Sequence, residues 1–262
     1  MELINSISSD DIKFTTLEDT KDGVSDTTYI LTDSNNKRYI CKLYESASLA
    51  EVKRERRLLS LLHGSFCVPS PMFELCKYKN RPLAFYSFIE GKSPQKPNTN
   101  QIKKIAKFLA RFHTISPKIG RSSEGFYTHK SMKKMLQDAP FEFQKRYKLI
   151  KNIPLFCDGL IHGDLFPDNS KFIGDELIGV FDFIDSSVGD FSFDLAVVAN
   201  SWCENDINTL LDSYNSFAPK SVSKNSLLNM MKFAALFYAL QRLHSGTKDY
   251  REYLAKFDFI NN

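Results

Sequence analysis

IHGDLFPDN at residues 161–169 and VFDF at residues 180–183 are the stretches from which the fold of this chain can be predicted. Between them, two β-rich runs flank Gly174-Asp175, a pattern that predicts a hairpin with a tight turn. Such a hairpin would bring the second stretch back beside the first. Three oxygen-bearing side chains would then share one site: Asp164, Asn169 and Asp182.

These residue types at this spacing are typical of phosphate transfer. The order H-x-D-x-x-x-x-N, followed by an Asp-Phe pair, is that of a protein-kinase catalytic loop and its metal-binding aspartate. Mg²⁺ takes oxygen ligands and usually keeps substrate phosphates in its shell, so Asn169 and Asp182 can suffice as its protein ligands. Asp164 would accept the proton of an attacking hydroxyl and orient it in line with the γ-phosphate of ATP. Any one of the three alone could cap a helix or stabilise a turn, so the prediction depends on the full set.

A lysine and a glutamate upstream are predicted to complete the phosphate site. Lys42 lies in the β-rich run 38–44, where a lysine can reach the α- and β-phosphates. Residues 48–62 have helical composition, and Glu55 shares its face with a stripe of leucines. A carboxylate beside a buried stripe needs a cation, so we predict that Glu55 pairs with Lys42, with Glu51 as the alternative partner. A structural interpretation, in which Glu55 is exposed among neighbouring arginines, also fits the pattern.

The segment expected to cover the phosphates is less specific. Gly23 and Ser25 precede a strand-like run and could contact a nucleotide through the serine and backbone amides. The segment has one glycine where a kinase phosphate loop has three, so a plain hairpin turn is an equal interpretation.

The chain resembles the aminoglycoside phosphotransferase and choline kinase group of small-molecule kinases. HGDLFPDN, GVFDF and FDLAVVANSWC (193–203) are similar to the pattern of the homoserine kinases within that group, and the similarity covers most of the chain. The resemblance implies a bilobal, protein-kinase-like α+β fold with a small β-rich N-terminal lobe and a larger, mainly helical C-terminal lobe. It implies ATP and Mg²⁺ as cofactors and L-homoserine as the hydroxyl acceptor, giving O-phospho-L-homoserine for threonine biosynthesis. Two departures put the acceptor in doubt: Gly163, where that family often has Ala, and Phe237, where a basic residue is expected.

Other functions remain open alternatives. Choline, ethanolamine, methylthioribose or an aminoglycoside could be the acceptor, although choline needs an aromatic cage and carboxylates. From a different class, the chain could be a non-catalytic nucleotide-binding regulatory module. That interpretation predicts the loss of a catalytic residue, and the sequence retains all four: Lys42, Asp164, Asn169 and Asp182.

Composition along the chain predicts where the lobes divide. Strand-like runs surround one helix in the first third, and the remainder is mainly helical, which predicts a nucleotide-binding lobe at 1–90 and a catalytic and substrate-binding lobe at 91–262. The resemblance implies that the end of the apolar run 83–89 is the hinge, where backbone groups of Ser87 and Ile89 would meet adenine.

Residues for the acceptor are expected in the helical stretch 233–243, which the resemblance assigns to the substrate lobe. A planar guanidinium can form two parallel hydrogen bonds with a carboxylate, so Arg242 is our candidate for the acceptor's carboxylate, with Tyr238 in the same site. Arg242 could instead brace an acidic loop such as the one holding Asp190. Two residues have structural interpretations: His113 as a packed, hydrogen-bonded core histidine, and Asp194 as a carboxylate that fixes loop backbone.

Charge and cysteine content limit the partners. Lys and Arg number 35 against 31 Asp and Glu, a net charge of +4 that is too small to argue for nucleic acid. The five cysteines include no C-x-x-C pair, as expected for reduced thiols. Neither a signal peptide nor an apolar run long enough to cross a membrane is evident. These features predict a cytoplasmic protein with no nucleic-acid or membrane partner, and they leave the oligomeric state open.

Overall fold

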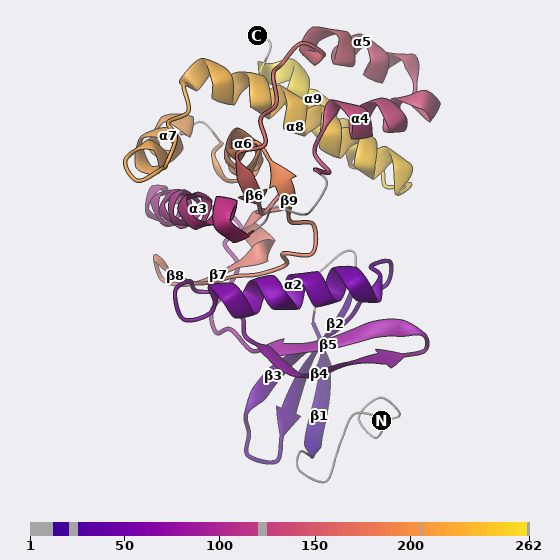
Figure 1. The fold of residues 1–262 in the computed structure, drawn as a ribbon, viewed down its shortest axis with the longest axis vertical. Helices are drawn as coiled ribbons and strands as arrows, with labels where there is room; N and C mark the ends of the chain where they lie inside the picture. Colours follow the sequence, from indigo (N-terminus) through magenta and orange to yellow (C-terminus); the bar gives the residue numbers. More distant parts are fainter. Residues whose placement is uncertain (1–12, 21–25, 120–124, 205, 261–262) are drawn as a thin grey trace. The chain divides into compact units, whose positions relative to one another are not determined.

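The computed structural model describes residues 13–20, 26–119, 125–204 and 206–260, which form two compact units (Figure 1). The first unit contains the described residues up to Pro94 together with Asp168–Ile184. The second contains Gln95–Pro167 and the described residues from Asp185 onward. The first unit is rich in β-strands and the second is mainly helical, as the α+β prediction requires.

A five-stranded antiparallel sheet with the strand order β1-β2-β3-β5-β4 is the framework of the first unit. Burial alternates along β3, so Tyr39, Cys41 and Leu43 enter the core while Lys42 points to the opposite face. The strands are β1 (Phe14–Asp19), β2 (Thr27–Asp33), β3 (Arg38–Leu43), β4 (Pro71–Tyr78) and β5 (Arg81–Ser87).

One helix of the first unit, α2 (Leu49–Leu62), lies across the sheet and packs against β4 and β5 (Figure 1). It begins at a capping box, because the Ser48 hydroxyl accepts the backbone N–H of Glu51 while the Glu51 carboxylate accepts the backbone N–H of Ser48. Its buried stripe contains a single charged residue, Glu55, among apolar side chains.

The hairpin predicted between the two motif stretches is present. Strands β7 (Ser170–Ile173) and β8 (Glu176–Val180) pair antiparallel, and Gly174 turns the chain with a φ of +58°. This hairpin belongs to the first unit, whereas the predicted division at residues 90 and 91 assigned it to the C-terminal lobe. Backbone hydrogen bonds explain the grouping. Lys92 and Phe172 exchange two of them at 2.9 Å, and the N–H of Val180 donates to the carbonyl of Cys67 at 2.8 Å.

The second unit is built on helices around one two-stranded ribbon. Strands β6 (Gly159–Ile161) and β9 (Ser187–Gly189) pair antiparallel, and the catalytic-loop sequence follows β6 directly. Helix α8 packs against both α6 and α9. The helices are α3 (Thr99–Ile119), α4 (His129–Met135), α5 (Phe141–Ile150), α6 (Phe191–Trp202), α7 (Ile207–Asn215), α8 (Lys224–His244) and α9 (Tyr250–Ile260), with a 3-10 turn at Leu136–Asp138. None of the helices in the described part of the chain combines the length and apolarity that a membrane span needs.

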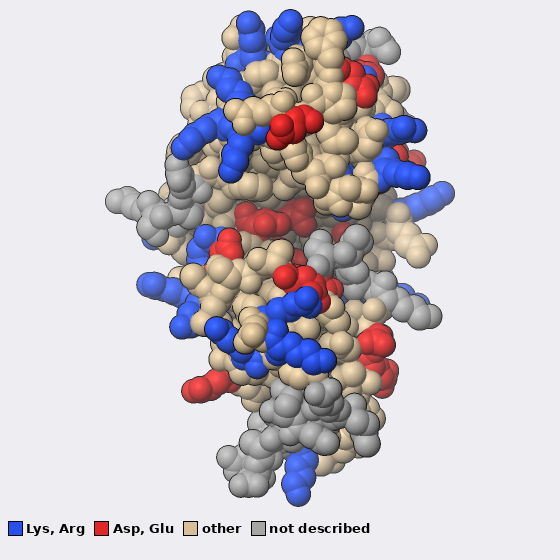
Figure 2. Space-filling model, turned by 90° about the vertical axis from the view of Figure 1, so that its right-hand side faces the viewer, with Lys and Arg blue, Asp and Glu red and all other residues tan. Residues whose placement is uncertain are grey.

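Basic and acidic side chains are interspersed on the face of the molecule shown in Figure 2. This mixture agrees with the small formal net charge of +4.

Candidate active site

Lys42 carries its ammonium group between two carboxylates of the first unit. Its Nζ lies 2.8 Å from Oδ1 of Asp182 and 3.1 Å from Oδ2 of Asp26. Burial disfavours the charge, but Asp182, Glu55 and Asp26 together outweigh it and raise the pKa of Lys42. The lysine is therefore a charged group beside the carboxylate that was predicted to bind metal.

Glu55 anchors the backbone next to Asp182 instead of pairing directly with Lys42. Its Oε1 accepts the N–H of Phe183 at 3.0 Å, and its Oε2 accepts the hydroxyls of Tyr44 and Tyr86, the latter at 2.9 Å. Burial and the charge of Asp182 raise the pKa of Glu55, while Lys42 and the tyrosine hydroxyls oppose that rise.

The predicted direct Lys42–Glu55 ion pair is thus wrong, and both residues instead bind the segment that contains Asp182 and Phe183. Lys42 holds the side chain of Asp182, and Glu55 holds the next backbone amide. The alternative partner, Glu51, is occupied by its capping box at the start of α2.

Asp182 and Asn169 lie at neighbouring positions of the hairpin. Ser170 pairs with Val180, and the N–H of Phe181 donates to the backbone carbonyl of Asn169 at 3.1 Å. Asp182 has a φ of +66°, a left-handed conformation that costs free energy in a residue other than glycine and that occurs often at functional sites. One carboxylate and one amide oxygen are ligands that Mg²⁺ prefers, and substrate phosphates can complete its shell. These two residues therefore fit a magnesium site.

The catalytic loop of the second unit is fixed by a buried carboxylate on α6. Asp194 is fully buried and accepts the backbone N–H groups of His162 and Gly163 at 2.8 and 2.7 Å. His113 contacts the same carboxylate at 3.0 Å and is hydrogen-bonded to Tyr214 on its other ring nitrogen at 2.8 Å. Burial raises the pKa of Asp194, but the hydrogen bond and charge of His113 and the loop N–H groups lower it overall. The predicted structural roles of Asp194 and His113 are confirmed.

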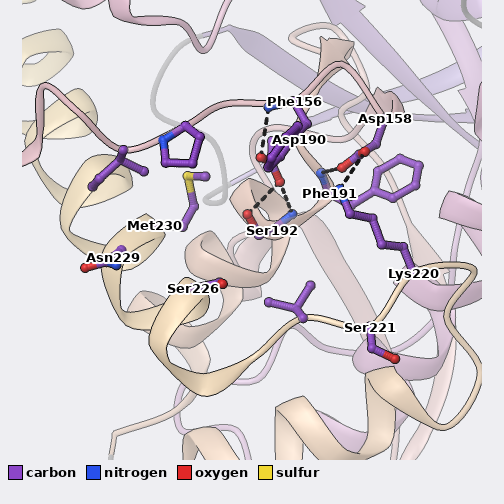
Figure 3. Close-up of a pocket in the computed structure, with 13 residues that line it drawn as sticks. Phe156, Asp158, Asp190, Phe191, Ser192, Lys220, Ser221, Ser226, Asn229 and Met230 are labelled. Atoms are coloured by element: carbon purple, nitrogen blue, oxygen red, sulfur yellow. Dashed lines mark hydrogen bonds and ion pairs between the residues drawn. The ribbon is translucent and has the colours of Figure 1, made fainter.

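The start of α6 is itself held in place, as Figure 3 shows. Asp190 caps the helix by accepting the N–H of Ser192 at 2.9 Å, and it also accepts the N–H of Phe156 at 3.0 Å. Asp158 accepts the N–H of Phe191 at 3.3 Å and pairs with Lys220 at 2.9 Å. These contacts border a cavity of about 210 Å³ and fix the helix that carries Asp194.

Asp164 is the next residue of this loop and lies beside a tyrosine of α8. The hydroxyl of Tyr238 donates to the carbonyl of Gly163 and lies 3.4 Å from Oδ1 of Asp164. Tyr127, which sequence reasoning did not identify, places its ring against Gly163. The one sequence feature that pointed to this contact is Gly163 itself, because the family that the chain resembles often has Ala at the position where Tyr127 packs.

Arg242 lies near the end of α8, with its side chain 29% exposed. Its Nε is 3.6 Å from Oδ2 of Asp249. The carboxylate that Arg242 pairs with is that of Asp249, in the turn between α8 and α9, whereas Asp190 accepts the N–H groups of Ser192 and Phe156. The alternative in which Arg242 braces an acidic loop therefore applies to the turn of Asp249.

The remaining residues predicted to contact the nucleotide are Ser87, Ile89, Gly23 and Ser25. Ser87 ends β5, and its backbone N–H already donates to the carbonyl of Ser70 at 2.9 Å. Ile89 lies against Gly179, where a Cβ would meet its side chain. Gly23 and Ser25 lie outside the described residues.

Known proteins resemble this chain in sequence and in fold. The sequence profile of the phosphotransferase enzyme family matches residues 16–218. A homoserine kinase of Methylobacillus flagellatus is 28% identical over 253 residues, which cover 85% of this chain and 77% of that protein. Among solved structures, the GDP and kanamycin complex of APH(2")-IIia has a TM-score of 0.74 at 17% identity and covers 99% of this chain and 97% of that one. Spectinomycin phosphotransferase in complex with ADP and spectinomycin has a TM-score of 0.69 at 17% identity, covering 99% and 93%. These neighbours confirm the protein-kinase-like fold.

Proposed function

Since this chain belongs to the phosphotransferase enzyme family, we propose that it transfers the γ-phosphate of ATP to the side-chain hydroxyl of L-homoserine. The observation that carries the proposal is the catalytic loop whose backbone Asp194 holds, with Asp164 directly after the two fixed amides. The homoserine kinase relative supports the choice of acceptor. The nucleotide complexes of structural neighbours support a nucleotide donor.

On the donor side, the first unit would bind ATP. Lys42 is charged and would contact the phosphates, while Asn169 and Asp182 would hold Mg²⁺. The ion would neutralise charge on the phosphate oxygens. Glu55 would keep Asp182 in its left-handed backbone conformation by holding the N–H of Phe183. Backbone groups near Ser87 and Ile89 would meet adenine.

On the acceptor side, Asp164 would accept the proton of the homoserine hydroxyl. The hydroxyl oxygen then forms a bond to the γ-phosphorus, the bond from that phosphorus to the β-phosphate oxygen breaks, and ADP leaves. Arg242 would meet the α-carboxylate, because its guanidinium is partly exposed and 3.6 Å from its nearest carboxylate, a loose pairing that an incoming carboxylate can replace.

The packing of aromatic side chains favours homoserine over choline. Tyr127, Tyr238 and Phe237 are each at most 5% exposed, and their rings pack against one another. A cage for a quaternary ammonium needs open aromatic faces, which these rings do not offer.

None of the five cysteines, all of which lie in the described part of the chain, takes part in a disulfide, and this supports action in the cytoplasm.

The experiment is a coupled assay of ADP release with ATP and Mg²⁺ against homoserine, choline, ethanolamine, methylthioribose and an aminoglycoside. We expect the highest kcat/KM with L-homoserine. Turnover of another alcohol alone would contradict the proposed acceptor. If the protein binds ATP but releases no ADP with any of these acceptors, the result would favour the non-catalytic module.

A further inference from the structure

We propose that Tyr238 is a positioning residue that holds the carboxylate of Asp164 in one orientation, and that Tyr127 fixes Tyr238 in turn. The inference rests on the proposed function, in which Asp164 accepts the proton of the acceptor. In this role Tyr238 acts on the catalytic loop, whereas the sequence had suggested that it contacts the acceptor.

The first observation is the contact between the phenol and the loop. The Tyr238 hydroxyl donates to the carbonyl of Gly163 and lies 3.4 Å from Oδ1 of Asp164, so it reaches two consecutive residues. A carboxylate rotates in a broad torsional well, and a phenol hydroxyl placed beside one of its oxygens restricts that rotation. The oxygen that receives the acceptor's proton is then presented in a defined direction.

The second observation is that the Tyr238 ring cannot easily move. The side chain is 5% exposed, its ring stacks on Tyr253 with centroids 5.8 Å apart, and it meets the edge of Phe166 at 5.1 Å. Phe193 adds a further stacked contact at 6.3 Å. Because rings enclose the phenol on several sides, its hydroxyl has a fixed position from which to hold Asp164.

The third observation links Tyr127 to the same point. Its ring packs on Phe193 with centroids 4.3 Å apart, and Phe193 in turn stacks on Tyr238 at 6.3 Å. Burial, reinforced by neighbouring carboxylates, raises the pKa of both tyrosines, so both remain neutral phenols that can donate.

The fourth observation explains the glycine before Asp164. Gly163 has a φ of +83°, and a Cβ there would lie 2.7 Å from Cζ of Tyr127 and closer still to two other atoms of that side chain. Only glycine combines this backbone conformation with room for the ring. Tyr127 occupies the space that an alanine methyl group would need, so its position beside the loop depends on the glycine.

The test is a double-mutant cycle on kcat, measured with whichever alcohol the enzyme phosphorylates fastest. Tyr238→Phe removes one hydroxyl and keeps the ring. We expect kcat to fall by about 10- to 100-fold while the KM for ATP stays within about twofold. In an Asp164→Asn background the same change should lower kcat by less than about threefold, because Tyr238 acts through Asp164.

Two further variants complete the design. Tyr147→Phe removes the hydroxyl of a partly buried tyrosine on α5 and should leave kcat unchanged. Tyr127→Leu removes the ring that packs on Phe193 and should lower kcat in the same direction as Tyr238→Phe, and it takes the place of that variant in the cycle if Tyr238→Phe does not fold. An equal loss of kcat with and without Asp164 would overturn the inference, and so would an unchanged kcat. Because the cycle uses any accepted alcohol, failure with homoserine alone would refute the proposed acceptor and leave this inference standing.

Discussion

Replacing Asp194 by Asn should destabilise the protein and slow catalysis together. The carboxylate is fully buried and accepts two loop N–H groups, at 2.8 and 2.7 Å, while His113 lies 3.0 Å away. Asparagine keeps the shape, but its NH₂ group cannot accept a hydrogen bond, so a buried donor loses its partner. An unsatisfied buried donor costs about 1–3 kcal/mol.

We therefore expect Asp194→Asn to lower the free energy of unfolding by about 1–3 kcal/mol, from the buried donor that loses its partner. At about 2–4 °C per kcal/mol for a chain of this size, Tm should fall by about 2–12 °C. The folded fraction should show a kcat lowered by at least about tenfold, because the loop carrying Asp164 loses its anchor. Urea unfolding and single-temperature kinetics measure the two effects separately.

Asp212→Asn is the matched control, since Asp212 is an exposed aspartate on α7. It should stay within about 0.5 kcal/mol of the wild type. If Asp194→Asn proves as mild as this control, the buried carboxylate is not what fixes the catalytic loop, and the reasoning fails.

The same carboxylate gives a pH dependence. Its folded-state pKa is lowered, so the stability it contributes is fully present above its unfolded pKa of about 3.9 and is lost as pH falls through the lower folded value. The wild type should lose stability below about pH 4, and Asp194→Asn should lose less over that range. Equal acid slopes in the two proteins would contradict the assignment.

Three further predictions follow from the site. Lys42→Ala and Glu55→Ala should each lower kcat/KM. Because both residues hold the Asp182 segment, the double variant should lose less activation free energy than the sum of the two single losses. Strict additivity would show that they act separately. Gly163→Ala should lower both Tm and kcat, since its methyl group collides with Tyr127, and a normal Tm and kcat would refute that packing. Arg242→Lys should raise the KM for homoserine by about tenfold and leave the KM for ATP unchanged, whereas a lower Tm with unaltered KM would make Arg242 a brace.

Local patterns sufficed to predict the hairpin beside the proposed catalytic loop. The loop residues are close in sequence, and the turn at Gly174 and the strands beside it each carry their own propensity. In the hairpin the residues that matter are neighbours along the chain. The structural role of Asp194 was also predicted, although its contacts with His162 and Gly163 span 32 and 31 positions.

Contacts between distant segments could not be predicted in the same way. Glu55 accepts hydrogen bonds from Tyr44, Tyr86 and the amide of Phe183 and does not pair directly with Lys42. These partners depend on where the tyrosine hydroxyls lie relative to α2. Tyr127 lies 36 positions before Gly163, and its position against that glycine results from aromatic packing with Phe193.

The central claim is that Asp164 activates the hydroxyl of L-homoserine toward ATP. The most direct measurement is the rate of O-phospho-L-homoserine formation by the wild type and by Asp164→Asn, at saturating ATP and Mg²⁺, together with the affinity of each protein for ATP. We predict rapid formation by the wild type, a kcat lower by about 10²–10⁴-fold in the variant, and an affinity for ATP that changes little. Near-normal turnover by Asp164→Asn, or no phosphohomoserine from the wild type, would contradict the account.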